Sequence, residues 1–199
     1  MKKLLLSLGL ILAITLSANA QRPRHHAPAR YHNNIGEVRM HVIGELGLYD
    51  VGNIFYHEYP RHYSIGAMAE SQLGRMLSIG LGAEYYGTRG IYTNNAYRPY
   101  LNSVPVYGNL RLSTPGWDAR CFIEGRAGYA FPIGTVSVSG THYAARGFFT
   151  GAGIGITLYG SNISVGVNTI DVNNGFGENN HRDVVTDVYL RYSYAIPMY

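Results

Sequence analysis

The stretch RGFFTGAGIGITL, residues 146–158, alternates between large apolar side chains and small ones. One parity holds Phe148, Ala152, Ile154, Ile156 and Leu158, and the other holds Gly151, Gly153, Gly155 and Thr157. Successive side chains of a β-strand point to opposite sides, so this period of two predicts a strand with two different faces. A phosphate-binding glycine loop would need a helix after it, and none is predicted here. The glycines therefore predict a face of small side chains within a strand.

Seven further segments alternate in the same way, and short connections take turns with long ones. The eight predicted strands cover residues 37–49, 62–73, 76–87, 103–112, 120–131, 147–158, 162–172 and 186–199. Short turns are predicted near 74–75, 113–119 and 159–161, and long loops at 50–61, 88–102, 132–146 and 173–183. This pattern predicts an all-β fold, a closed antiparallel up-and-down transmembrane β-barrel with tight periplasmic turns and longer extracellular loops. Residues 135–139 also alternate, which leaves a count of ten strands open.

Alternating strands also fit a soluble β-sandwich, so the position of the charges matters. Nearly every ionisable residue of the eight strands lies on the parity opposite the apolar one, and Asp171 is the exception. Charge facing lipid at mid-membrane costs about 2–4 kcal/mol per Arg or Lys, whereas acids and arginines inside a barrel can pair. We therefore predict a polar interior closed by a charge network of Glu37, Arg39, Glu45, Glu70, Glu84, Arg111, Glu124, Arg126, Asp187 and Arg191.

The apparent basicity of the chain comes mostly from its first residues. Lys2 and Lys3 are the only lysines, and without them fourteen arginines face twelve acids. Three of these arginines lie within residues 21–35, so the remainder is close to neutral and predicts no nucleic-acid partner. The single cysteine, Cys121, excludes an intramolecular disulfide framework.

The N-terminal residues predict export. Residues 1–20 combine two lysines, an uncharged apolar run and the small-x-small end Ala18-Asn19-Ala20, as a cleaved signal peptide does. Residues 21–35 are polar and contain proline, and we expect a flexible periplasmic tail before a barrel at 36–199. His25, His26 and His32 in the tail suggest a metal site only weakly, because no acid or cysteine accompanies them, so we predict no metal and no cofactor.

The chain resembles small outer-membrane β-barrel proteins of the OmpX and opacity-protein kind. The segments that carry the resemblance are SVPVYGNLRL (103–112), CFIEGRAGYAF (121–131), RGFFTGAGIGITL (146–158) and DVYLRYSYAIPMY, which ends at Tyr199. The resemblance implies a place in the outer membrane of a Gram-negative bacterium, in contact with lipid and lipopolysaccharide and with both termini in the periplasm. It also implies that the barrel-assembly machinery reads the terminal aromatic strand. It carries over no catalytic residue.

One pair of residues raises the question of catalysis. His62 and Ser64 share a face at a spacing that would allow a His-activated serine, which resembles a His-x-Ser element of lipid A-modifying barrels. Those enzymes act on the lipid side, whereas His62 and Ser64 fall on the predicted interior parity. We therefore predict a protein that is not an enzyme, with lipid A modification as an alternative.

The long loops are the predicted place of a specific function. Exposed tyrosine, histidine and arginine favour contact surfaces. The candidates are Tyr56, His57, Tyr59, Tyr92, Tyr97, Arg98 and Tyr100. We predict a barrel that contributes to envelope structure or binds an extracellular protein or glycan through these loops. A narrow channel for small solutes is a second alternative.

Overall fold

The computed structural model describes residues 36–50, 62–88, 92–93, 96–97, 101–115, 119–138, 141–174 and 181–196. These residues form strands joined by turns, without a helix that is long and apolar enough to cross a membrane. The strands are β1 (Val38–Asp50), β2 (His62–Gln72), β3 (Leu77–Thr88), β4 (Tyr92–Thr93), β5 (Ala96–Tyr97), β6 (Leu101–Ser113), β7 (Ala119–Pro132), β8 (Val136–Val138), β9 (Thr141–Leu158), β10 (Ser161–Asn174) and β11 (His181–Ile196).

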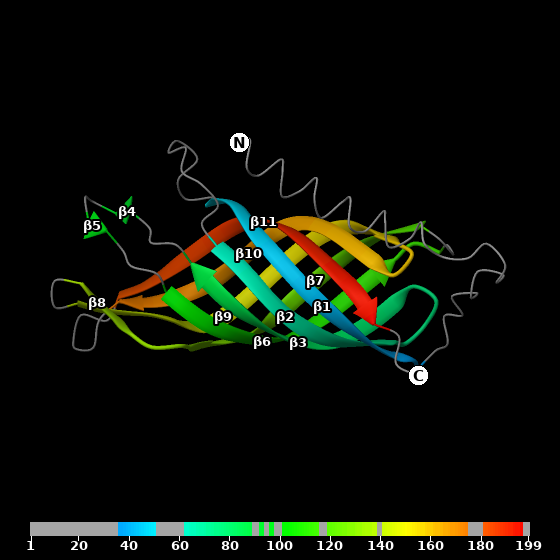
Figure 1. Ribbon diagram of the computed structural model, residues 1–199, viewed down its shortest axis with the longest axis horizontal. Helices are drawn as coiled ribbons and strands as arrows, with labels where there is room; N and C mark the ends of the chain where they lie inside the picture. The colour runs from blue at the N-terminus through cyan, green and yellow to red at the C-terminus, as the bar shows by residue number, and fades with distance from the viewer. Residues whose placement is uncertain are drawn as a thin grey trace. The chain divides into compact units, whose positions relative to one another are not determined.

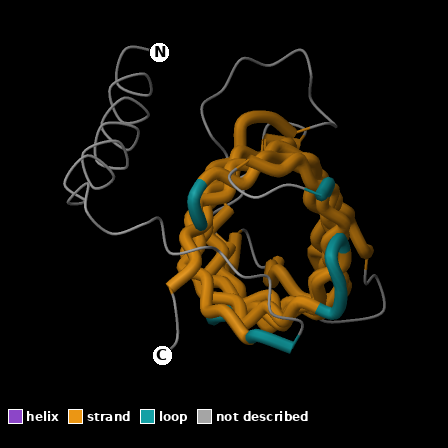
Figure 2. Tube along the Cα trace, turned by 90° about the vertical axis from the view of Figure 1, so that its right-hand side faces the viewer, coloured by secondary structure: helices purple, strands orange, loops and turns teal. Residues whose placement is uncertain are grey.

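Eight of these strands close into an antiparallel barrel, which Figure 1 shows from the side and Figure 2 end-on. The order is β10-β11-β1-β2-β3-β6-β7-β9, and β9 pairs with β10 to complete the ring. The first and last barrel strands meet along a register that runs from Met40 opposite Ile196 to Asp50 opposite Asp187. The predicted closed barrel of eight antiparallel strands is thus confirmed.

The extra strands do not enter the ring. β8 pairs with the beginning of β9, Val136 opposite Tyr143, and β4 and β5 form a separate two-stranded sheet. The alternating segment at 135–139 is therefore a short strand beside the barrel, and the ten-strand alternative is wrong for the described residues.

The two ends of the barrel differ, and we name them by their connections. Residues 73–76, 114–118 and 159–160 join strands at the turn end, where β1 begins and β11 ends. Tyr159 and Gly160 both have positive φ, 48° and 86°, as a two-residue hairpin turn requires. The opposite end, where β1 ends and β2 begins, is the loop end, and β8 pairs with the beginning of β9 there.

Two predicted loops are shorter than expected, because strands continue into them. β9 begins at Thr141 and not near 147, β10 ends at Asn174, and β11 begins at His181. Loop boundaries of 132–146 and 173–183 are therefore wrong. Ala144 and Ala145 are buried next to each other there, so burial does not alternate with a period of two and the pattern does not predict a strand.

Asp171 lies on the outward parity, as the sequence predicts, and yet it is 5% exposed. Its neighbour on β11, Val184, is 58% exposed. The register between β10 and β9 shifts there: Ile170 faces Phe149, and Val172 faces Ala145. Three residues of β9 bulge opposite Asp171, Gly147 takes φ 136°, and the Asp171 carboxylate accepts the Phe148 N–H at 2.8 Å. The bulge therefore covers Asp171, and sequence parity does not reveal this burial.

Candidate functional site: the charged barrel interior

The two faces of the barrel wall have opposite chemistry. Large apolar side chains point outward and stay exposed, up to 72% at Leu81 and 62% at Ile154. The opposite parity is buried, and Glu45, Arg126 and Asp187 are 2–3% exposed. An eight-stranded barrel is just wide enough for side chains to fill. Its packed interior combines charged and polar groups with a cluster of buried apolar and aromatic side chains that includes Ile43, Met68 and Phe149.

Glu45 lies at the centre of this interior. Its Oε2 accepts from Nη1 of Arg126 and from Nη1 of Arg191, both at 3.1 Å. Its Oε1 lies 3.1 Å from Nε2 of His62 and also accepts the Asn168 side-chain amide. One carboxylate thus joins side chains from five strands, β1, β2, β7, β10 and β11. A buried carboxylate stays charged only when it is paired in this way.

Glu84 from β3 forms a second centre beside the first. Its carboxylate lies 2.8 Å from Arg191 Nη1 and 3.8 Å from Arg126 Nη1. It also accepts hydrogen bonds from the hydroxyls of Ser64 and Tyr107. The two arginines therefore lie between two glutamates, and this arrangement links opposite walls of the barrel.

A separate chain of charges lies nearer the turn end. Arg111 on β6 contacts Glu70 at 3.1 Å and Glu124 at 3.0 Å, and its guanidinium lies 4.3 Å from the centre of the Phe122 ring. Ser164 donates to Glu124 at 3.2 Å. His41 lies 4.0 Å from Glu70. At the rim, the half-exposed pair Glu37 and Arg39 is joined at 3.1 Å.

His62 bridges two acids toward the loop end. Its Nδ1 lies 3.1 Å from Asp187 Oδ2, and its Nε2 lies 3.1 Å from Glu45 Oε1. Tyr86 stacks on the ring at 4.6 Å and donates to Asp187 at 3.0 Å. Carboxylates only accept hydrogen bonds, so both contacts form together when the imidazole carries two N–H groups. His62 is then the cation that pairs with Asp187.

This geometry differs from the His-activated serine that the sequence suggests as an alternative. Both ring nitrogens of His62 face carboxylates, and the Ser64 hydroxyl donates to Glu84. His62 and Ser64 are 2% and 5% exposed inside the barrel. A nucleophile needs its base within hydrogen-bond reach and its substrate beside it, and neither residue meets lipid in this position.

Glycines on the interior parity make room for these side chains. A Cβ on Gly82 would lie 2.6 Å from the Tyr107 ring, and one on Gly155 would lie 2.5 Å from the Phe122 ring. Gly153 and Gly166 face the Tyr189 hydroxyl in the same way. The glycine-rich stretch of β9 is therefore a wall against which long polar side chains lie.

All ten residues of the predicted charge network therefore take part in ion pairs of the barrel. Sequence reasoning left out the uncharged members that complete it, chiefly Asn168, Tyr86, Tyr107 and Tyr189. All four share the interior parity, and this is the signal that could have found them. Asn168 Oδ1 accepts a hydrogen bond from Arg126 Nη2 at 2.9 Å, and the Arg126 guanidinium carbon lies 4.6 Å from the centre of the Tyr189 ring.

The predicted surface residues fall mostly outside the described part of the chain. Tyr92 and Tyr97 lie opposite each other in the β4–β5 pair. Tyr56, His57, Tyr59, Arg98 and Tyr100 lie outside the described residues, as do His25, His26, His32 and Tyr199. Among the described residues, His, Cys, Asp and Glu side chains form no group of three or more that could hold a metal ion.

Aromatic side chains gather on the outer face near the loop end. Tyr129 lies 5.1 Å from Phe131 and 6.5 Å from Phe148 between ring centres, and Tyr63 lies 6.3 Å from Tyr85. Phe148 is 64% exposed. We call Tyr129, Phe131 and Phe148 the aromatic belt.

The solved structures to which the chain is similar include the following two. The N-terminal β-barrel domain of Pseudomonas aeruginosa OprF is 11% identical, with a TM-score of 0.43 over 80% of this chain and 96% of that domain. The outer membrane protein AlkL, solved in DMPC bilayers, is 9% identical, with a TM-score of 0.46 over 89% of this chain and 98% of that one. No family model and no curated protein matches the chain. The assignment of the fold rests on the strand register described above.

Proposed function

We propose that this chain is an integral outer-membrane β-barrel of a Gram-negative bacterium, which stabilises the envelope or binds at the cell surface without catalysis. The observation that carries the proposal is the inverted wall: exposed aliphatic side chains outside and paired charges inside. A water-soluble barrel would expose charge and bury apolar groups, whereas a lipid-facing wall requires the reverse. The aromatic belt supports it further, since aromatic rings favour the membrane interface.

The orientation follows from the connections. Short turns at one end and longer connections at the other are typical of barrels whose turns face the periplasm. We infer that the turn end, with both ends of the barrel chain, lies in the periplasm, and that the loop end faces outward. Residues 51–61 and 89–100 then carry surface binding, on a rigid base that holds their ends in place.

Cell fractionation and gel mobility test the membrane assignment. The full chain is expected in the outer-membrane fraction and to migrate as a compact band in SDS until it is boiled. Recovery as a soluble periplasmic protein would contradict the assignment.

The loops need a separate test. Replacing residues 53–60 with glycine and serine is expected to leave the mobility shift intact and to abolish binding of cells to a glycan or matrix-protein array. Replacement of the turn-end residues 114–118 with glycine and serine is the control. Unchanged array binding in the loop variant would contradict surface recognition by this loop.

Catalysis can be examined on lipid A itself. We expect identical lipid A mass spectra from cells that carry the wild-type chain, a His62→Gln variant or no copy of the chain. A mass difference that disappears with His62→Gln would favour the lipid-modifying alternative.

A further inference from the structure

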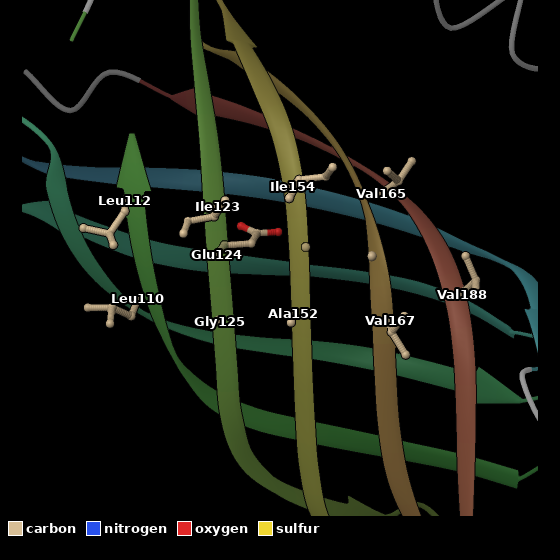
Figure 3. A pocket seen from close by; sticks show the side chains of 12 residues that line it. Leu110, Leu112, Ile123, Glu124, Gly125, Ala152, Ile154, Val165, Val167 and Val188 are labelled. Carbon is tan, nitrogen blue, oxygen red and sulfur yellow. The ribbon is translucent and has the colours of Figure 1, made fainter. Parts of the chain in front are cut away.

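The outer wall is not uniformly covered by large side chains. One hollow lies over β6, β7, β9 and β10, and a second of similar volume, about 660 Å³, lies beside it toward the turn end, beyond Ile123 and Ile154. Register places four outward residues side by side: Leu110, Gly125, Ala152 and Val167. The two in the middle are the smallest, and a Cβ on Gly125 would meet nothing within 4 Å. Figure 3 shows the resulting hollow, with Gly125 and Ala152 between the longer side chains. Its volume is about 650 Å³.

The hollow has a closed side and an open side. Toward the turn end, the next outward pair on β7 and β9 is Ile123 beside Ile154, which are 55% and 62% exposed. Toward the loop end, the next outward pair is Ala127 beside Thr150, and the aromatic belt follows with Tyr129 beside Phe148. A strip of small side chains therefore runs from the isoleucines up to the belt.

A cation lies on the far side of the belt. Arg146 on β9 is exposed, and its Nε donates to the Tyr129 hydroxyl at 3.3 Å. Within the described part of the chain, Arg146 makes no other polar contact, so its Nη1 and Nη2 atoms meet no carboxylate there. The acid nearest in register, Asp171, is buried beneath Gly147 and accepts a backbone N–H. Arg146 thus presents a guanidinium edge outward.

The spacing of these parts matches one leaflet. Ala152 faces Val167 and Ala145 faces Val172, so the bulge places Arg146 between four and five β10 residues from Ala152, about 15 Å along the strands. With a strand tilt of about 40°, the separation along the membrane normal is about 11 Å. The apolar band of such a barrel is about 25 Å tall, so a guanidinium at this height reaches headgroup level when Ala152 lies near the middle of the band.

We propose that this face binds one phosphorylated acyl glycolipid of the outer leaflet, the lipid A class, with a phosphate on Arg146 and an acyl chain in the Gly125–Ala152 hollow. The inference rests on the proposed outer-membrane placement, which puts the loop end in the outer leaflet. Arginine suits phosphate because its planar guanidinium offers two parallel N–H donors. The belt lies between the two contacts, where rings pack on the upper part of an acyl chain.

The test is lipid binding by the full chain folded in detergent, followed by native mass spectrometry. The probe is purified lipid A, with phosphatidylglycerol as the second anionic lipid. Arg146→Gln is expected to weaken lipid A binding about tenfold, as loss of a charge-assisted contact does. Ala152→Leu, which fills the hollow, is expected to weaken it at least about fivefold.

Two matched controls separate the site from general effects. Arg75→Gln removes an exposed arginine at the turn end, and Ala83→Leu enlarges an outward alanine on β3. Both are expected to bind lipid A as the wild type does. Three results would each overturn the proposal. The first is equal affinity for lipid A in the wild type and all four variants, and the second is binding of phosphatidylglycerol as tight as that of lipid A. The third is a change of oligomeric state with Ala152→Leu, because a second copy of the chain would then occupy the hollow.

The heat-dependent mobility shift is recorded for each variant. A variant that keeps the shift is folded, so its affinity reports on the lipid site. A wild-type chain that folds into the outer membrane but binds no lipid A would overturn this inference and leave the proposed function intact.

Discussion

Glu45 receives two guanidinium groups, an imidazole and an amide at one buried position. Glu45 lies on β1, next to the seam with β11, and its contacts join five strands. At the scale of single residues, paired buried charge therefore adds to the apolar packing of the interior.

Neutralising Glu45 is expected to be costly. Glu45→Gln keeps the shape but leaves Arg126 and Arg191 sharing Glu84, and removing one partner of a buried pair destabilises by about 3–5 kcal/mol. The free energy of unfolding is measured by urea titration of the protein in lipid vesicles, with the heat-sensitive gel band as the signal of the folded form. Glu37→Gln at the half-exposed rim is the control and should cost less than about 1 kcal/mol. Equal losses in the two variants would show that the central pairing contributes nothing special.

Gly153 tests the close approach of Tyr189. Gly153→Ala would push a methyl group into the Tyr189 hydroxyl, and overpacking of this kind costs about 1–3 kcal/mol. Adding Tyr189→Phe should recover part of the loss, because the hydroxyl is gone. Gly125→Ala, on the outer face with open space around it, is the matched control and should be close to neutral. Additive losses in the double variant would refute the contact.

At the scale of elements, the strand ends hold what the period of two could not predict. Strands β9, β10 and β11 continue past the residues whose alternation ends, and the bulge at Gly147 covers Asp171. Backbone pairing with a neighbouring strand extends these elements, and this pairing is invisible to a pattern that detects only one buried face.

The Tyr159–Gly160 turn offers a stabilising change. Tyr159 holds φ 48°, a left-handed conformation that costs a side-chain-bearing residue about 1–2 kcal/mol. Asparagine tolerates that conformation and precedes glycine in many hairpin turns of this type. Tyr159→Asn is therefore expected to raise the free energy of unfolding by about 1 kcal/mol, seen as a higher urea midpoint. A lower midpoint would mean that the exposed ring itself contributes more than the backbone strain.

Removing the contact between Asp171 and the bulge is expected to affect hydrogen exchange only locally. Asp171→Ala removes the acceptor of the Phe148 N–H, so hydrogen exchange at Phe148 and its neighbours at the loop end should become faster. Exchange at β9 residues near the turn end, such as Ile156, should not change. Faster exchange along the whole strand would instead assign Asp171 a global role.

The barrel wall has two environments, and ion pairs bridge the interior at its centre. Guanidinium groups of Arg126 and Arg191 lie between Glu45 and Glu84, with tyrosine rings beside them. Figure 2 shows the closed ring of strands from which these side chains come. The narrow-channel alternative therefore has little room in the described interior.

Conductance measures this directly. Wild-type protein in planar bilayers is expected to show no steps of porin size, because ion pairs bridge the barrel at its centre. The double variant Glu45→Gln with Glu84→Gln, which neutralises both centres, is measured for comparison. If it folds, it should conduct more than the wild type. Large, sustained wild-type conductance would favour the channel.

The sequence by itself determined which side chains of each strand face inward, and it predicted a barrel of eight strands with ten left open. It could do so because a strand has a period of two, and a slip of one residue would move every charge to the other face. Only the tertiary structure decided which charges meet. Glu45 on β1 and Arg126 on β7 are 81 residues apart, and their contact depends on the stagger of closed strands. The same stagger lines up Gly125, Ala152 and Arg146 on the outer face, where four separate strands build one hollow.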